Sequence, residues 1–85
     1  MNTADKNILR LIEILKTSGR IKYDTEFCEA IGLRKQNLVN IKADRNHFTP
    51  EQIERVLTTY KINANWIFGL SSKMSLTMET VADTR

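Results

Sequence analysis

Apolar residues recur along most of the chain at the three- and four-residue spacing of an amphipathic helix. The clearest runs are residues 5–17 and residues 53–60. Their apolar positions are Ile8, Leu11, Ile12 and Leu15, followed later in the chain by Ile53, Val56, Leu57 and Tyr60. This spacing gives each segment one apolar stripe that can face a common core. Both segments are therefore predicted to be core helices.

Local signals predict where the helices begin and end. Thr3 or Asp5 can cap the N-terminus of the first helix, and Asp24 is a suitable N-cap for a later helix. Residues 49–52, Thr-Pro-Glu-Gln, combine an N-cap threonine, a proline at the first position and the glutamine of a capping box. Residues 63–69, NANWIFG, predict a short fifth helix that is capped by asparagine and ended by glycine.

Between the two core helices lies the stretch YDTEFCEAIGLRKQNLVNIK, residues 23–42, whose spacing is typical of two short helices joined by a tight turn. Gly32 suits the turn because glycine readily adopts a positive φ. Cys28, four positions earlier, supplies a small side chain where the two helices would cross. Leu38 and Ile41 would hold the second short helix against the first. The spacing as a whole is that of a helix-turn-helix.

The other side of the second short helix is polar. At roughly 100° per residue, Leu38 and Ile41 point one way, while Gln36, Val39 and Asn40 lie on the outward arc. Side-chain amides can form bidentate hydrogen bonds with the edge of adenine. Taken alone, the amides fit an ordinary solvated helix better. The complete helix-turn-helix spacing favours DNA binding.

Basic residues are concentrated around this outward arc. The chain has 13 basic and 10 acidic residues, which gives a net charge of +3. Residues 33–47 alone hold four basic residues and one acidic residue, so this segment has the same net charge: Arg34, Lys35, Lys42, Arg45 and Asp44. Such a concentration suits a polyanionic partner. A solvated basic face on a protein that binds no nucleic acid is the alternative, because the number of charges is small.

Length and composition exclude several classes of protein. A chain of 85 residues, 41% of them hydrophobic, predicts one compact domain without an interdomain cleft. The single cysteine and the single histidine, His47, offer no disulfide and no zinc-ligand spacing, and no acid, base and nucleophile cluster is apparent. We therefore expect no enzyme, metal, cofactor or small-molecule ligand. No secretory signal and no apolar run near the ~20 residues of a membrane helix is present, so we expect a cytoplasmic protein.

The order of these features resembles the Cro/repressor type of helix-turn-helix domain, the lambda-repressor-like domain of phage and bacterial repressors. The resemblance covers about residues 5–70. Within it, NANWIFG is similar to the Asn-x-x-Trp-Leu-Leu-x-Gly closing segment that is common in phage-repressor N-terminal domains. It implies an all-α fold, a compact five-helix bundle. It also implies a bacterial or phage, nucleoid-associated transcriptional repressor that occupies a palindromic operator in double-stranded DNA as a homodimer.

The resemblance also implies which residues contact DNA. Base contacts fall on Lys35, Gln36 and Asn40, and Asn37 and Val39 are placed to touch base or backbone. Phosphate contacts are expected from the cations around the helix and from the start of the preceding helix: Arg34, Lys42, Arg45, Thr25 and Lys22.

Three residues depart from the pattern of the family. Arg34 stands where a capping Ser or Thr is usual, and Asp44 stands where a Gly usually follows the second helix of the motif. Asp24 stands where many members have a phosphate-binding Gln, and its carboxylate would repel phosphate. That contact is therefore expected to move to Thr25, Lys22 or Tyr23.

Residues 1–70 are predicted to form the DNA-binding domain, and residues 71–85 a C-terminal tail, linker or dimerisation segment. Met74, Leu76 and Met78 alternate with polar residues there, as in a strand that pairs with a partner. Together with surplus apolar residues in the first helix, this favours a homodimer. Two rivals to the repressor remain: a DNA-binding antitoxin of a toxin–antitoxin pair, and a protein-interaction domain that retains the fold without binding DNA.

Overall fold

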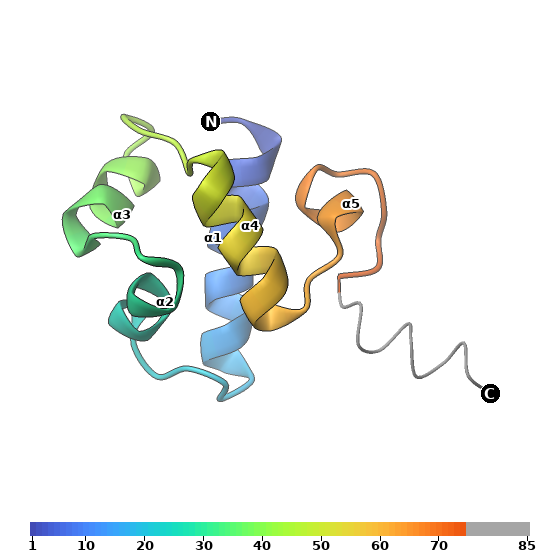
Figure 1. The fold of residues 1–85 in the computed structure, drawn as a ribbon, viewed down its shortest axis with the longest axis horizontal. Helices are drawn as coiled ribbons and strands as arrows, with labels where there is room; N and C mark the ends of the chain where they lie inside the picture. The colour runs from blue at the N-terminus through green and yellow to red at the C-terminus, as the bar shows by residue number, and fades with distance from the viewer. Residues whose placement is uncertain (75–85) are drawn as a thin grey trace.

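The computed structural model describes residues 1–74, and this part of the chain folds into five helices without a β-strand. In chain order they are α1 (Thr3–Thr17), α2 (Asp24–Ile31), α3 (Lys35–Lys42), α4 (Pro50–Tyr60) and α5 (Ala64–Ile67). In the view of Figure 1, α1 and α4 occupy the centre, α2 and α3 lie on one side of them, and α5 lies on the other. The predicted compact, all-α, five-helix domain is confirmed at this level.

The core is built from the predicted apolar stripes. Val56 and Tyr60 are buried on α4, whereas Ile53 and Leu57 are partly buried against them. The ring of Phe27 stacks on that of Tyr60, with 5.6 Å between the ring centroids, which packs α2 on α4. Side chains with essentially no exposure come from all five helices: Ile8, Leu11, Ile12, Phe27, Ile31, Ile41, Val56 and Ile67. Each such side chain contributes about 1.5–3 kcal/mol by leaving water.

The start of α4 follows the sequence signal closely. The Thr49 hydroxyl accepts a hydrogen bond from the Gln52 amide at 3.2 Å, and the Gln52 side-chain oxygen accepts one from the Thr49 amide at 3.0 Å. This reciprocal pair satisfies two backbone donors that the first helical turn would otherwise leave open. The predicted capping box is confirmed.

The start of α1 differs from the prediction. Asn2 is the N-cap, because its side-chain oxygen accepts a hydrogen bond from the Asp5 amide at 2.8 Å. The carboxylate of Asp5 is instead buried, with 1% of the residue exposed, and accepts hydrogen bonds from the Phe48 amide at 3.1 Å and from His47 Nδ1 at 2.6 Å. Asp5 thereby joins the start of α1 to the loop before α4.

The start of α2 also lies one residue earlier than predicted. Tyr23 is the N-cap residue and Asp24 is the first helical residue. The Glu26 carboxylate accepts hydrogen bonds from the backbone amides of Lys22 at 3.0 Å and Tyr23 at 3.3 Å, which stabilises the approach to the helix. The carboxylate of Asp24 is therefore not needed as a cap.

Helix α5 closes the core from the opposite side. Asn63 caps it as predicted, since its side-chain oxygen accepts a hydrogen bond from the Asn65 amide at 3.0 Å. Of its three neighbouring apolar residues, Ile67 is fully buried, Trp66 is half-buried against the core, and Phe68 is 51% exposed. Ile67 therefore closes the core most completely, and Trp66 packs partly against the core beside it.

Side-chain amides tether both sides of α5. Asn7 of α1 donates hydrogen bonds to the carbonyl oxygens of Trp66 and Ile67 at 3.1 and 2.9 Å. Asn63 donates through its side chain to the Lys73 carbonyl at 2.9 Å and through its backbone to the Met74 carbonyl at 2.7 Å. The first part of the predicted tail therefore returns to α5.

Met74 packs against the core, so the described chain continues past the predicted domain boundary at residue 70. Leu76 and Met78, on which the predicted alternating strand depends, lie outside the described residues. Among the helices of residues 1–74, none combines the length and the hydrophobicity that crossing a membrane requires.

Candidate nucleic-acid interface

Two short helices, α2 and α3, are joined by the tight turn that the sequence predicts. Gly32 has φ 69°, in the left-handed region, where a side chain is disfavoured. The Leu33 amide donates to the Cys28 carbonyl at 2.8 Å, which closes the end of α2. A Cβ on Gly32 would also come within 2.4 Å of the Arg55 guanidinium, although that flexible group can move aside. Backbone conformation is therefore the main reason for glycine here.

The inner side of α3 is anchored by few residues. Leu38 and Ile41 are buried as predicted, and they are the only buried residues of this helix. Cys28 of α2 is buried too, and burial raises the pKa of its thiol. A thiol in this setting is a small packing group and a poor nucleophile.

The outward side of α3 displays the side chains that the sequence places there. Gln36 is exposed and Val39 is 45% exposed, whereas Asn37 and Asn40 are half-buried. The Gln36 amide nitrogen lies 3.5 Å from the Asn40 side-chain oxygen, at the outer limit of a hydrogen bond. Both amides can therefore bind a ligand, because only this one weak hydrogen bond between them would be lost.

Both ends of α3 carry exposed cations. Arg34 occupies the N-cap position without a side-chain capping bond, and Lys35 is the first helical residue. Lys42 ends the helix and Arg45 follows it. Because no side chain caps the start of α3, backbone N–H groups of its first turn have no side-chain acceptor. Such groups can donate hydrogen bonds to an anion.

The end of α3 uses Asp44 where glycine would be expected. Asp44 has φ 61°, the left-handed conformation that aspartate tolerates better than most residues. The Arg45 amide donates to the Asn40 carbonyl at 2.8 Å, which closes the helix, and the Asp44 carboxylate pairs with the N-terminal amine of Met1 at 3.1 Å. Asp44 therefore takes the conformation that glycine would usually supply at the end of the helix.

Lys42 is already engaged within the protein. Its ammonium lies 2.9 Å from Asp24 Oδ2, and the ammonium of Lys16 lies 3.1 Å from Asp24 Oδ1. The hydrogen bond from Lys42, helped by Lys16, holds the pKa of the Asp24 carboxyl below its ordinary value. Sequence reasoning missed this bridge because its three residues come from α1, α2 and α3 and share no local pattern.

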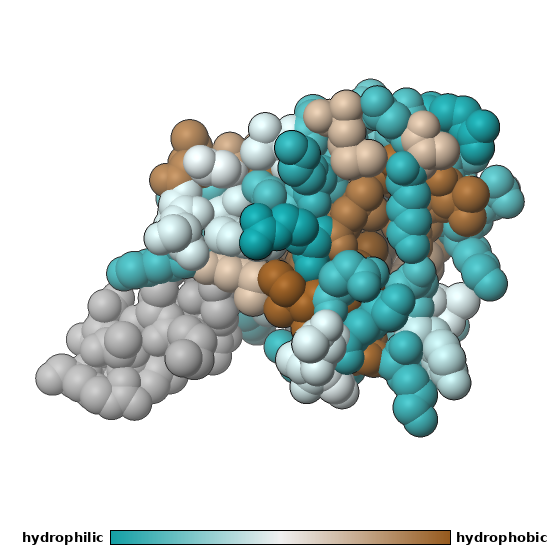
Figure 2. Space-filling model, turned by 180° about the vertical axis from the view of Figure 1, so that it is seen from behind, coloured by the Kyte–Doolittle hydropathy of each residue, from teal (hydrophilic) through white to brown (hydrophobic). Residues whose placement is uncertain are grey.

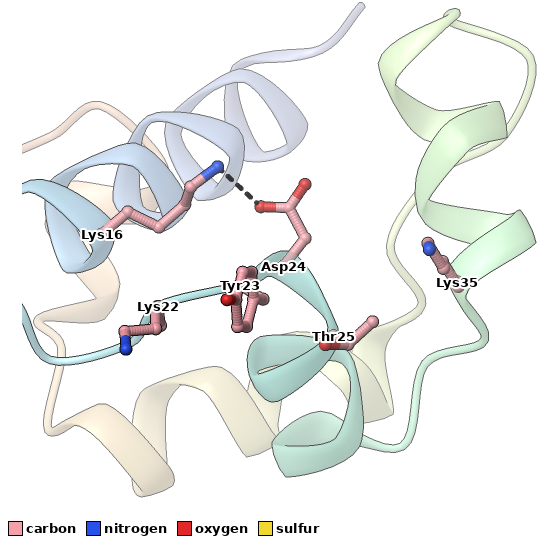
Figure 3. A pocket seen from close by; sticks show the side chains of 6 residues that line it. All are labelled: Lys16, Lys22, Tyr23, Asp24, Thr25 and Lys35. Atoms are coloured by element: carbon pink, nitrogen blue, oxygen red, sulfur yellow. Dashed lines mark hydrogen bonds and ion pairs between the residues drawn. The ribbon is translucent and has the colours of Figure 1, made fainter.

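An open hollow of about 390 Å³ lies beside the start of α2 (Figure 3). It brings together three residues that the sequence assigned separately to DNA contacts, Lys22, Thr25 and Lys35. Its other lining residues are Lys16, Tyr23 and Asp24, so the formal charges of the lining sum to +2. The remaining predicted contact residues do not line it: Arg34, Gln36, Asn37, Val39, Asn40, Lys42 and Arg45.

A second, chemically different surface lies at the other side of the molecule. Phe68 and Leu70, at the end of α5, are 51% and 77% exposed. Seen from behind in Figure 2, the surface is mostly hydrophilic, with hydrophobic side chains reaching it in the middle. No basic cluster accompanies Phe68 and Leu70 in the sequence, so this surface suits an apolar partner.

Within residues 1–74, no group of three His, Cys, Asp or Glu side chains is placed to hold a metal ion. Comparisons of the chain with protein-family models, with curated proteins and with solved structures found no match. The interface is therefore characterised by its own geometry and charge.

Proposed function

We propose that this protein binds duplex DNA and that α2, the Gly32 turn and α3 act as a helix-turn-helix. The observation that carries the proposal is the division of α3 into two sides. Leu38 and Ile41 are buried inside, whereas Gln36 and Val39 are exposed outside. Exposed cations flank the outward side at both ends of the helix. This is the layout that a helix needs to enter the major groove and contact base edges.

Base contacts in this proposal come from Lys35, Gln36 and Asn40. An amide side chain presents one donor and one acceptor in a plane, which matches N6 and N7 of adenine, and lysine matches the acceptors of guanine. Val39 lies beside the amides and is suited to the methyl group of thymine. Asn37, which is half-buried as Asn40 is, is assigned a contact with either base or backbone.

Phosphate contacts come from residues that surround α3. Arg34 and Arg45 are exposed and have no ion pair with another described residue. Lys22 and Thr25 line the hollow at the start of α2, together with Lys35. These contacts hold the protein on DNA of any sequence, whereas the amides distinguish one sequence from another.

The proposal includes a homodimer that occupies an inverted repeat and represses transcription. One module of this size makes few phosphate contacts, and specific affinity usually requires two modules on half-sites about 34 Å apart. The exposed Phe68 and Leu70 support a dimer contact at α5. Sedimentation of the full chain should give a dimer, and replacing both residues with serine should shift it toward monomer. A chain that sediments as a monomer at all concentrations would contradict this part.

The decisive experiment is selection of genomic fragments by the purified protein at a stated salt concentration, followed by affinity measurements on the selected site. We expect an enriched inverted repeat. Replacing Gln36 with alanine should cost about 1–3 kcal/mol on that site and relax the choice at one base pair.

Arg45→Ala is the matched control, because it removes a cation beside the same helix. It should weaken binding to all sequences alike and make the salt dependence shallower by about one unit of slope. If the Gln36 variant keeps the same base preference, α3 does not contact bases as proposed. If the folded protein binds no duplex at all, the protein-interaction domain becomes the better interpretation.

A further inference from the structure

Asp24 is the acidic residue most closely associated with the basic residues of the candidate interface. It opens α2, and its carboxylate oxygens reach one lysine on each side, Lys42 of α3 at 2.9 Å and Lys16 of α1 at 3.1 Å. It also lines the hollow that holds Lys22, Thr25 and Lys35. Figure 3 shows the Lys16 ammonium directed at the carboxylate, with Lys35 on the opposite side of the hollow.

The carboxylate occupies the place that a phosphate oxygen would be expected to take. It lies at the N-terminus of a helix, where backbone dipoles favour an anion. It accepts two charge-assisted hydrogen bonds from ammonium groups, the same type of donor that binds a DNA phosphate. Because Lys42 and Lys16 hold the pKa of this carboxyl below its ordinary value, Asp24 is ionised at neutral pH.

The two lysines are nevertheless within reach of solvent. The side chain of Lys42 is 45% exposed and that of Lys16 is 34% exposed, whereas the side chain of Asp24 is 26% exposed. An ammonium group has three donors, so either lysine can turn to an external anion. A partly exposed pair of this kind is weak, and exchange of one partner costs little.

We propose that Asp24 is an internal competitor for DNA phosphate. In the free protein it holds Lys42 and Lys16, and it places a negative charge beside Lys22 and Lys35. A phosphate that approaches this part of the interface must displace the carboxylate from a lysine and meet its repulsion. Asp24 therefore lowers the affinity of the protein for DNA of any sequence. This inference rests on the proposed function, because it concerns the same interface.

The test compares five proteins on a duplex of random sequence over a range of salt concentrations: wild type, Asp24→Asn, Lys42→Gln, Glu54→Gln and the double variant Asp24→Asn/Lys42→Gln. Asparagine keeps the shape of the side chain and removes its charge. The Asp24→Asn protein should bind about fivefold more tightly at 0.1 M salt, and the slope of log affinity against log salt should steepen by about one unit. Fluorescence anisotropy measures both quantities.

Glu54→Gln is the matched control, because Glu54 is an exposed residue of α4 and its replacement changes the net charge equally. It should leave affinity and slope close to those of wild type. The gain on replacing Asp24 should be smaller in the double variant, measured against Lys42→Gln, than in Asp24→Asn, measured against wild type, because Lys42 is no longer there to be released. Thermal unfolding followed by circular dichroism checks that each variant is folded.

Four results would overturn the proposal. If Asp24→Asn and Glu54→Gln bind equally, or if the gain survives undiminished in the double variant, Asp24 does not compete for Lys42. If folded Asp24→Asn binds more weakly, Asp24 positions α3 and does not oppose phosphate. If wild type and all variants are folded and none binds duplex DNA, the proposed function itself fails and this inference falls with it.

Discussion

Helices α3 and α4 are both short, but they differ in how their first turns are stabilised. Helix α4 has 11 residues, begins with Pro50 and is closed at its start by the reciprocal Thr49 and Gln52 bonds. Helix α3 has 8 residues, follows an N-cap residue, Arg34, that forms no side-chain capping bond, and has two buried residues, as α4 does. Isolated helices of either length are marginal in water. The comparison shows that α4 is specified largely by its own sequence, whereas α3 depends on what surrounds it.

Three carboxylates lie around α3 and the loop that follows it, and each has a partner in another part of the chain. Asp24 of α2 holds Lys42 at its end, and the left-handed Asp44 after it pairs with the N-terminal amine. Asp5 of α1 binds the loop that leads from α3 to α4. The outward side of α3 can carry exposed amides and cations because Leu38 and Ile41, on its inner side, hold the helix against the core. The three predictions below test this difference.

The largest effect is expected at the buried side of α3. Replacing Ile41 with alanine should lower the free energy of unfolding by about 2–5 kcal/mol, because a fully buried side chain is lost and a cavity remains. Val39→Ala, on the outward side of the same helix, should change it by only about 0.5 kcal/mol or less. Urea denaturation of the two variants measures the contrast. Equal losses would mean that the outward side is packed against something in the folded protein.

A smaller effect is expected at the carboxylate that ties down the loop. Replacing Asp5 with alanine should cost about 1–3 kcal/mol, because the buried Phe48 amide loses its acceptor and His47 loses its partner. Asp44→Asn removes a carboxylate that is 53% exposed at its side chain and should cost only about 0–1 kcal/mol. Thermal unfolding of both variants tests the pair. An Asp5 variant as stable as wild type would show that the loop is held by other contacts.

The smallest effect concerns the pH dependence of stability at the Asp24 bridge. Folding lowers the pKa of Asp24 from its ordinary value of 3.8, mainly through the hydrogen bond from Lys42. The resulting stabilisation is present above that ordinary value and is lost as the pH falls through the lowered one. Wild type should therefore exceed Asp24→Asn in stability at pH 7 by at most about 1 kcal/mol. The gap should shrink in acid.

Urea denaturation of both proteins between pH 7 and pH 2.5 measures this gap. Glu54→Gln serves again as the control for losing an exposed carboxylate. A gap that stays constant over the range would mean that the charge of Asp24 contributes nothing to folding, and its contacts with Lys42 and Lys16 would then be incidental.

Local sequence patterns determined much of this fold. The apolar stripes of α1 and α4, the capping box at Thr49, the asparagine cap of α5 and the turn at Gly32 all lie where the pattern predicts. The outward side of α3 also follows from helical periodicity alone, once Leu38 and Ile41 are taken as buried. Such features depend on residues within one or two turns of each other, and helical geometry relates those residues directly.

Only the tertiary structure decided how these elements are joined and which charges are free. The chain pattern could not assign Asp5 to the Phe48 amide, 43 residues away, or bring Lys16, Asp24 and Lys42 together from three helices. It also could not decide that Ile67, not Trp66, fills the core beneath α5. These outcomes depend on how the helices are placed relative to one another. That placement decides which side chains meet across the core, and the spacing of residues within one helix does not specify it.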